Sequence, residues 1–253
     1  MYLHAEKSTL KGSVAIPGSK SHTIRALVLA ALAHGSSKIL SPLESLDTRA
    51  GVEACRAFGA KIDTSDPNCW LVDGVNGQPQ APNDVINVGN SGTTLYIIMS
   101  TAALVREGWT VITGDAQIRR RPCDKLIHAL HSLGAEIVST RGNCLCPLVI
   151  RGPWRGGCAS IEAITSQWVS SILLNAPLAS GETILNVPLL NEAPYVQMTL
   201  DWLKRLNVQV DHNADMSEFR IPGGQAWCGF ERPVAADFSS ATFFLVAGAA
   251  LDA

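Results

Sequence analysis

Three residues near the start of the chain have the chemistry to bind an anion. The segment "PGSKSHTIR" places Lys20, Ser21 and Arg25 where an apolar helix would begin. Free backbone N–H groups and aligned peptide dipoles make a helix N-terminus attractive to anions. Lysine adds a point charge, and arginine adds a planar fork that suits a carboxylate. The alternative is that the segment is only a well-capped helix.

Similar polar segments precede three further apolar stretches. These segments are "VGNSGTT", "AITSQ" and "ADFSS". Capping would explain one suitable residue per helix, at about 1 kcal/mol each. It does not explain Lys20 together with Arg25, nor glycines on both sides of Asn90-Ser91, which would let backbone approach a ligand closely. We therefore expect several helix N-termini to meet at one anion-binding cleft.

The loop "RRRPCD", residues 119–124, adds local positive charge. Adjacent arginines usually form a solvated surface, but a shared cleft would draw in at least one of them. "GNSGTT" lacks the lysine of a Walker loop and the spacing of a dinucleotide fingerprint. These residues alone indicate a small substrate with several negative charges, and no more.

Composition excludes some classes of partner. The 253 residues carry a net charge of −2, which gives no basic footprint for nucleic acid or an anionic membrane. No signal peptide or membrane-spanning apolar run is evident. Seven cysteines without regular spacing fit a reducing cytoplasm. Cys144 and Cys146 would share one face of a strand but have no second ligand pair, so we expect neither metal nor cofactor.

The elements that would position these residues repeat along the chain. Apolar helices close on glycines that recur every 73 residues, at Gly35, Gly108 and Gly181. A second series of helices closes on Gly59, Gly134 and Asn207. Glycine and asparagine tolerate the left-handed conformation that ends many helices. Each unit therefore predicts helix, strand, helix and then one or two strands.

The same period makes a prediction about the last apolar stretch. A fourth helix is expected from Asp237, and its closing glycine would fall one residue beyond Ala253. We therefore expect the chain to be the N-terminal piece of a longer protein.

The quoted segments, with "RRRPCDKLIHALHSLGAEI", "TSQWVSSILLNAPLA" and "PYVQMTL", resemble the enolpyruvyl transferases, in particular the branch acting on shikimate 3-phosphate. They occur in family order across essentially the whole chain. The resemblance implies an α/β fold, an inverted α/β barrel of βαβαββ units with pseudo-threefold symmetry. It divides the chain into residues 1–17 and 236–253, parts of a discontinuous domain, and residues 18–235, a complete domain of three units.

The implied reaction transfers enolpyruvyl from phosphoenolpyruvate to the 5-hydroxyl of shikimate 3-phosphate and releases phosphate, through a tetrahedral intermediate and without metal. By resemblance, shikimate 3-phosphate would be bound by Lys20, Ser21, Arg25, Thr165, Ser166 and Gln167. Phosphoenolpyruvate would be bound by Lys20, Asn90, Gly92, Arg121 and Gln167. The family's catalytic Asp and Glu would lie in a C-terminal half, so we expect none in this segment and no turnover by this chain alone.

Two residues depart from the family pattern. Glu192 stands where a phosphate-binding serine is usual, and a carboxylate 4 Å from a phosphate would cost about 4 kcal/mol per charge pair. We therefore expect Glu192 to turn away, or its loop to be built differently. Tyr96 replaces a usual arginine beside the phosphoenolpyruvate site, where the inhibitor glyphosate competes. That replacement predicts altered glyphosate sensitivity in the complete enzyme.

Two alternative functions remain at this point. The sibling family that uses UDP-N-acetylglucosamine carries a loop cysteine where this chain has Ala116, and an asparagine where it has Ser21. The other alternative is a non-catalytic binding or assembly module. Activity measured with and without a complementary C-terminal chain would distinguish this module from an enzyme. An enzyme should gain activity from that chain, which would bury the apolar face Phe243-Phe244-Leu245.

Overall fold

The computed structural model describes residues 2, 4 and 11–250. Its α-helices are α1 (Lys20–Leu32), α2 (Leu46–Ala57), α3 (Gly92–Ala103), α4 (Asp124–Ser132), α5 (Ser166–Asn175), α6 (Ala193–Arg205) and α7 (Phe238–Ala250). Its strands are β1 (Ser36–Leu40), β2 (Lys61–Asp66), β3 (Cys69–Asp73), β4 (Ile86–Asn87), β5 (Thr110–Thr113), β6 (Glu136–Ser139), β7 (Leu148–Arg151), β8 (Gly157–Ala163), β9 (Thr183–Leu190), β10 (Asp211–His212), β11 (Glu218–Ile221) and β12 (Glu231–Pro233).

The strands form three four-stranded sheets of identical design. Their orders are β12-β1-β3-β2, β4-β5-β7-β6 and β8-β9-β11-β10. In each sheet the first two strands are parallel and the other neighbours are antiparallel. The predicted unit of helix, strand, helix and two strands is confirmed in all three repeats.

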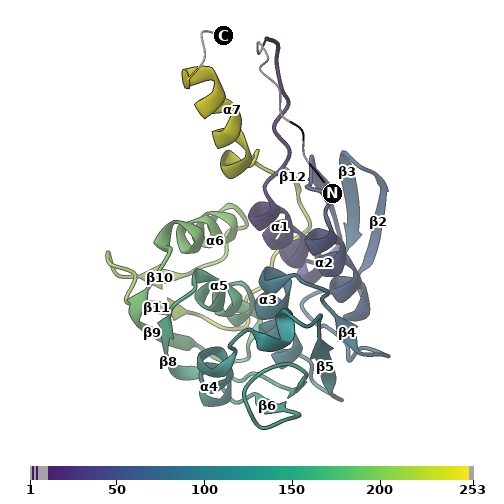
Figure 1. Ribbon diagram of the computed structural model, residues 1–253. Coiled ribbons are helices and arrows are strands. Elements are labelled where there is room, and N and C mark those ends of the chain that lie inside the picture. Colours follow the sequence, from purple (N-terminus) through teal and green to yellow (C-terminus); the bar gives the residue numbers. More distant parts are fainter. Residues whose placement is uncertain (1, 3, 5–10, 251–253) are drawn as a thin grey trace.

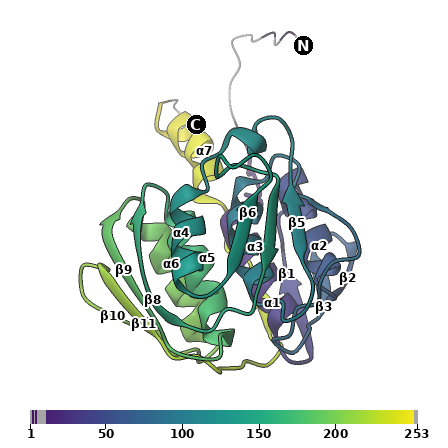
Figure 2. The same ribbon diagram turned by 90° about the horizontal axis from the view of Figure 1, so that it is seen from below.

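The first helix of each unit lies inside the molecule. In α1 ten of 13 residues are buried, in α3 all 12 and in α5 nine of ten. By contrast, α2, α4 and α6 bury one face only, as their spacing of apolar residues predicts. The sheets lie around these helices (Figure 2). The side chains at the starts of α1, α3 and α5 are therefore positioned by helices with little freedom to move.

The two predicted series of helix ends have different outcomes. Gly59, Gly134 and Asn207 each follow the last helical residues and have positive φ, as predicted. The first series was misassigned, because α1, α3 and α5 end several residues before Gly35, Gly108 and Gly181. Those glycines lie instead in the turns that lead into β1, β5 and β9.

The first sheet is completed by a strand from the far end of the chain. β12 pairs in parallel with β1, and Phe230 O accepts a hydrogen bond from Lys38 N at 2.7 Å. Next to it, Ser19 N donates to Ala235 O and Asp237 N donates to Pro17 O, both at 2.8 Å. The incoming and outgoing segments therefore run side by side between α1 and α7 (Figure 1).

The fourth helix begins as predicted, with Asp237 Oδ2 accepting hydrogen bonds from Ser240 N and Oγ. α7 extends away from the other helices (Figure 1), and none of its residues is buried. Phe243, Phe244 and Leu245 are 78%, 51% and 57% exposed. Within the described part of the chain, no helix has both the length and the apolar character needed to cross a membrane.

Candidate anion-binding site at the helix N-termini

The start of α1 borders a cleft of about 330 Å³. Lys20, Ser21, Tyr195 and Asp237 are among its lining residues. The Ser19 side chain makes no capping hydrogen bond, so capping does not explain this segment. Lys20 is exposed and its Nζ lies 2.7 Å from the Asp47 carboxylate. The predicted cation therefore lies at a cleft, and it is held by Asp47, a partner that was not predicted.

Arg25 lies inside the molecule, at the contact between three helices. It is 1% exposed, and its guanidinium donates to Thr199 Oγ1, Ser170 Oγ, and the backbone oxygens of Ser21 and Tyr195, at 2.7–3.1 Å. Burial lowers its pKa to about 10, so it stays charged at neutral pH. Four of its five N–H groups are thus engaged within the described structure. Arg25 joins α1 to α5 and α6 and is not a free fork.

The starts of α1 and α3 are connected through Asp47. Its carboxylate holds Lys20, and its backbone oxygen accepts a hydrogen bond from Thr94 Oγ1 at 3.3 Å. Asp47 lies in the first turn of α2, which a capping box between Ser45 and Thr48 fixes. That Ser-x-x-Thr pattern was the available sequence signal for a rigid carboxylate here.

The structure brings Asn90, Gly92 and Arg121 together at the start of α3. A Cβ added to Gly92 would lie 2.7 Å from Arg121 Nη1, so the guanidinium rests against the first turn of the helix. Asn90 Nδ2 donates to Gln117 Oε1 at 3.2 Å, in the turn that leads to Arg121. Backbone N–H groups, an amide and a guanidinium thus converge on one helix end, which is a suitable arrangement for a phosphate.

Tyr96 connects this helix to the arginine loop. Its hydroxyl donates to Pro122 O at 3.0 Å, and its ring packs edge-on against Trp168 of α5, with centroids 6.0 Å apart. Burial is the main cause that raises its pKa to about 12. Tyr96 therefore positions the loop of Arg121 through a neutral hydrogen bond.

The start of α5 contains Thr165, Ser166 and Gln167 in sequence. Thr165 Oγ1 accepts from Gln167 N at 3.4 Å, whereas Gln167 Oε1 is buried and has no hydrogen-bond partner among the described residues. Ser166 is 1% exposed and donates to the Glu192 carboxylate from Oγ at 2.9 Å and from its backbone N at 3.3 Å.

Of the two alternatives for Glu192, the side chain does not turn away from this helix end in the structure, whereas its loop does have an unusual backbone conformation. Its carboxylate points to the helix end because two donors and the positive end of the peptide dipoles stabilise it there. Glu192 itself has a φ of 58°, the left-handed conformation that is uncommon for a residue with a side chain.

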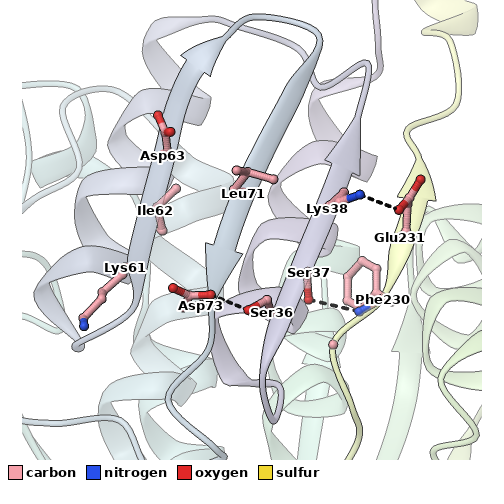
Figure 3. A pocket seen from close by; sticks show the side chains of 11 residues that line it. Ser36, Ser37, Lys38, Lys61, Ile62, Asp63, Leu71, Asp73, Phe230 and Glu231 are labelled. Atoms are coloured by element: carbon pink, nitrogen blue, oxygen red, sulfur yellow. Dashed lines mark hydrogen bonds and ion pairs between the residues drawn. The ribbon is translucent and has the colours of Figure 1, made fainter.

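A larger hollow of about 590 Å³ lies elsewhere, on the outer face of β1, β2 and β3 (Figure 3). Several of its charged side chains already have partners: Lys38 pairs with Glu231 at 3.1 Å, and Asp73 accepts a hydrogen bond from Ser36 at 2.5 Å. No residue predicted to bind substrate lines it.

The cysteine prediction also needs correction: Cys144 lies in a turn with a φ of 56°, outside any described strand.

Comparisons with known proteins agree with this arrangement. A model of the family "EPSP synthase (3-phosphoshikimate 1-carboxyvinyltransferase)" matches residues 5–253. Proteins named 3-phosphoshikimate 1-carboxyvinyltransferase are 50% identical in Ruminiclostridium cellulolyticum and 51% in Acetivibrio thermocellus, each over 98% of this chain. The chain spans 58% of the length of both relatives.

Solved structures give the same result for the fold. A structure of EPSP synthase from Acinetobacter baumannii superposes with a TM-score of 0.83 at 28% identity. The match covers 94% of this chain and 53% of that one. The expected fold class is therefore confirmed.

Proposed function

The chain belongs to the EPSP synthase family, and from this premise we propose that its helix N-termini bind shikimate 3-phosphate and phosphoenolpyruvate for enolpyruvyl transfer. The transfer would go to the 5-hydroxyl of shikimate 3-phosphate, with release of phosphate. Membership of the family and the names of the relatives support this reaction over the UDP-N-acetylglucosamine alternative.

The observation that carries the proposal is the position of Arg121 against the first turn of α3. A guanidinium and free helix N–H groups facing one point would hold the phosphate of phosphoenolpyruvate, with Asn90 and Gly92 beside it. Arg121 is exposed, so a ligand can reach it.

The other residues predicted to bind substrate would contact different parts of the two substrates. Lys20, at the cleft, would contact both substrates, and Ser21 would bind the shikimate carboxylate. Arg25 would bind the same carboxylate, and it also holds Ser21 O and Tyr195 O in place. Thr165, Ser166 and Gln167 would bind the 3-phosphate side, where the unpartnered Gln167 Oε1 suits a substrate hydroxyl.

We also propose that turnover needs an acidic pair that the described residues do not supply. Three carboxylates lie at the site, and each has another partner: Asp47 pairs with Lys20, Glu192 with Ser166, and Asp237 with Ser240. Because these contacts give the three carboxylates other roles, we expect the acidic pair to come from elsewhere. A separate C-terminal half is the expected partner, and the exposed face of α7 is the surface it would cover.

Three finer points belong to the same proposal. The division at residues 18–235 is supported by the paired segments around Gly18 and Ala236. A cytoplasmic location is supported by seven free thiols. Altered sensitivity to glyphosate is supported by Tyr96, which fixes the Arg121 loop through Pro122.

Calorimetric titration of the chain tests the binding function. Shikimate 3-phosphate should bind more tightly than inorganic phosphate, and Arg121→Gln should weaken phosphoenolpyruvate binding by about tenfold or more, the loss of one charge-assisted bond. Arg141→Gln, at an exposed turn, is the matched control. Equal affinity for shikimate 3-phosphate and inorganic phosphate would refute the proposed substrate.

Turnover is tested separately. The purified chain should release no phosphate from the two substrates. Adding a polypeptide that covers the part of a curated relative beyond the matched region should restore release. Turnover by the chain alone would refute the need for further catalytic groups, and a complemented but inactive complex would favour the binding-module alternative.

A further inference from the structure

The loop between β9 and α6 directs a carboxylate into the proposed phosphate site. Asn191 N donates to Ala163 O at 3.0 Å, which fixes the loop beside the segment that leads into α5. The next residue, Glu192, adopts its left-handed conformation and accepts two hydrogen bonds from Ser166. The backbone therefore places this carboxylate at the start of α5.

No cation neutralises the Glu192 carboxylate within the described chain. The ion pairs of the described residues do not include it. Lys125, at the start of α4, is paired with Glu162 at 2.8 Å. The negative charge of Glu192 is thus stabilised by the Ser166 donors and the end of the helix alone.

The same donors would serve the phosphate of a substrate. Ser166 has one backbone N–H and one hydroxyl at this end of α5, and both are used by Glu192. A carboxylate and a phosphate cannot share them, because both are acceptors and both are negatively charged. Glu192 is an exposed residue, so its side chain can turn into solvent without breaking an ion pair.

We propose that Glu192 is a built-in competitor for the substrate's phosphate, and that it determines how strongly this chain selects for a phosphorylated ligand. The inference rests on the proposed function of the α5 site. A phosphate binds at Ser166 only when the Glu192 side chain has left, so its apparent affinity is reduced by the fraction of time the carboxylate is bound. Contacts to the part of the substrate that carries no phosphate do not depend on Glu192.

The test compares the chain with two variants. Glu192→Gln removes the negative charge, and Glu192→Ser also shortens the side chain so that it cannot contact Ser166. Inorganic phosphate is titrated while the Ser166 amide is followed by NMR. The phosphate concentration at half-saturation should fall about tenfold in Glu192→Ser. This is the change expected if the Glu192 carboxylate occupies the site about nine-tenths of the time. Glu218→Gln, which removes a carboxylate of β11 that is paired with Arg220, should behave like the unchanged chain.

Each outcome decides the inference. An unchanged midpoint in both Glu192 variants, or no movement of the Ser166 amide in any protein, would overturn it and leave Glu192 as a helix cap. Circular dichroism and the thermal midpoint confirm folding, and Glu192→Gln gives the answer if Glu192→Ser does not fold. Titration with shikimate and shikimate 3-phosphate separates the two proposals. If the Glu192 variants bind inorganic phosphate more tightly but do not prefer shikimate 3-phosphate to shikimate, the role of Glu192 stands and the proposed substrate is refuted.

Discussion

Arg25 stabilises the meeting point of three helices by donating from α1 to Ser170 of α5 and Thr199 of α6. Lysine has only three donors and no planar fork, so Arg25→Lys cannot make the four hydrogen bonds that arginine makes. We expect the free energy of unfolding to fall by about 2 kcal/mol or more, measured by urea denaturation. Arg205→Lys, at the surface end of α6, should change it by less than about 0.5 kcal/mol. Equal effects of the two variants would contradict the structural role of Arg25.

Tyr96 predicts a pH dependence of stability. Its pKa is raised to about 12 in the folded chain, against about 10 when unfolded, because burial disfavours the phenolate. Between these values the folded state holds the proton longer, so stability is full below pH 10 and falls as the pH rises towards 12. Denaturation midpoints should decline more steeply over this window in the wild-type chain than in Tyr96→Phe. Parallel declines would show that Tyr96 does not contribute.

At the scale of the elements, three equivalent glycines allow strand ends to pass close to helix ends. A Cβ on Gly74, Gly152 or Gly223 would lie less than 3 Å from backbone oxygens in the last turn of α1 or α3 or in the segments that follow α1, α3 and α5. The neighbouring atoms are backbone and cannot turn aside. Gly152→Ala should therefore cost about 1–3 kcal/mol of unfolding free energy. Gly248→Ala in α7, with open space around it, is the control and should not destabilise the chain.

The elements that repeat with a clear apolar period were predictable from the sequence, and those without one were not. The helices α3 and α5 are buried on nearly all sides, and α2 and α4 were found by the period of the glycines that follow them. β12 escaped prediction because three exposed residues, Glu231–Pro233, carry no alternation. The partners of Arg25 within the protein, Ser170 and Thr199, could not be predicted because they lie 145 and 174 residues away. The direction of Glu192 depends on a left-handed backbone that its residue type does not indicate.

For the whole molecule, closure of the first sheet by β12 links the two ends of residues 18–235. Trp227, 4% exposed, anchors the returning segment by donating from Nε1 to Leu29 O at 2.8 Å, and its backbone oxygen accepts from His34 N at 2.9 Å. Since the first unit is complete only when residues 226–233 are in place, it cannot reach its native state independently of the last. Unfolding should therefore be a single cooperative transition.

Trp227→Ala tests this coupling, because it removes a buried indole far along the chain from the unit it stabilises. We expect a loss of about 3–5 kcal/mol with the transition still single, and about 1 kcal/mol for Trp227→Phe, which loses the hydrogen bond but keeps most of the volume. Fluorescence and circular dichroism should give coincident denaturation curves for both variants. A separate early transition in Trp227→Ala would mean that the first unit unfolds alone, and that the contact between β1 and β12 does not unite the three repeats.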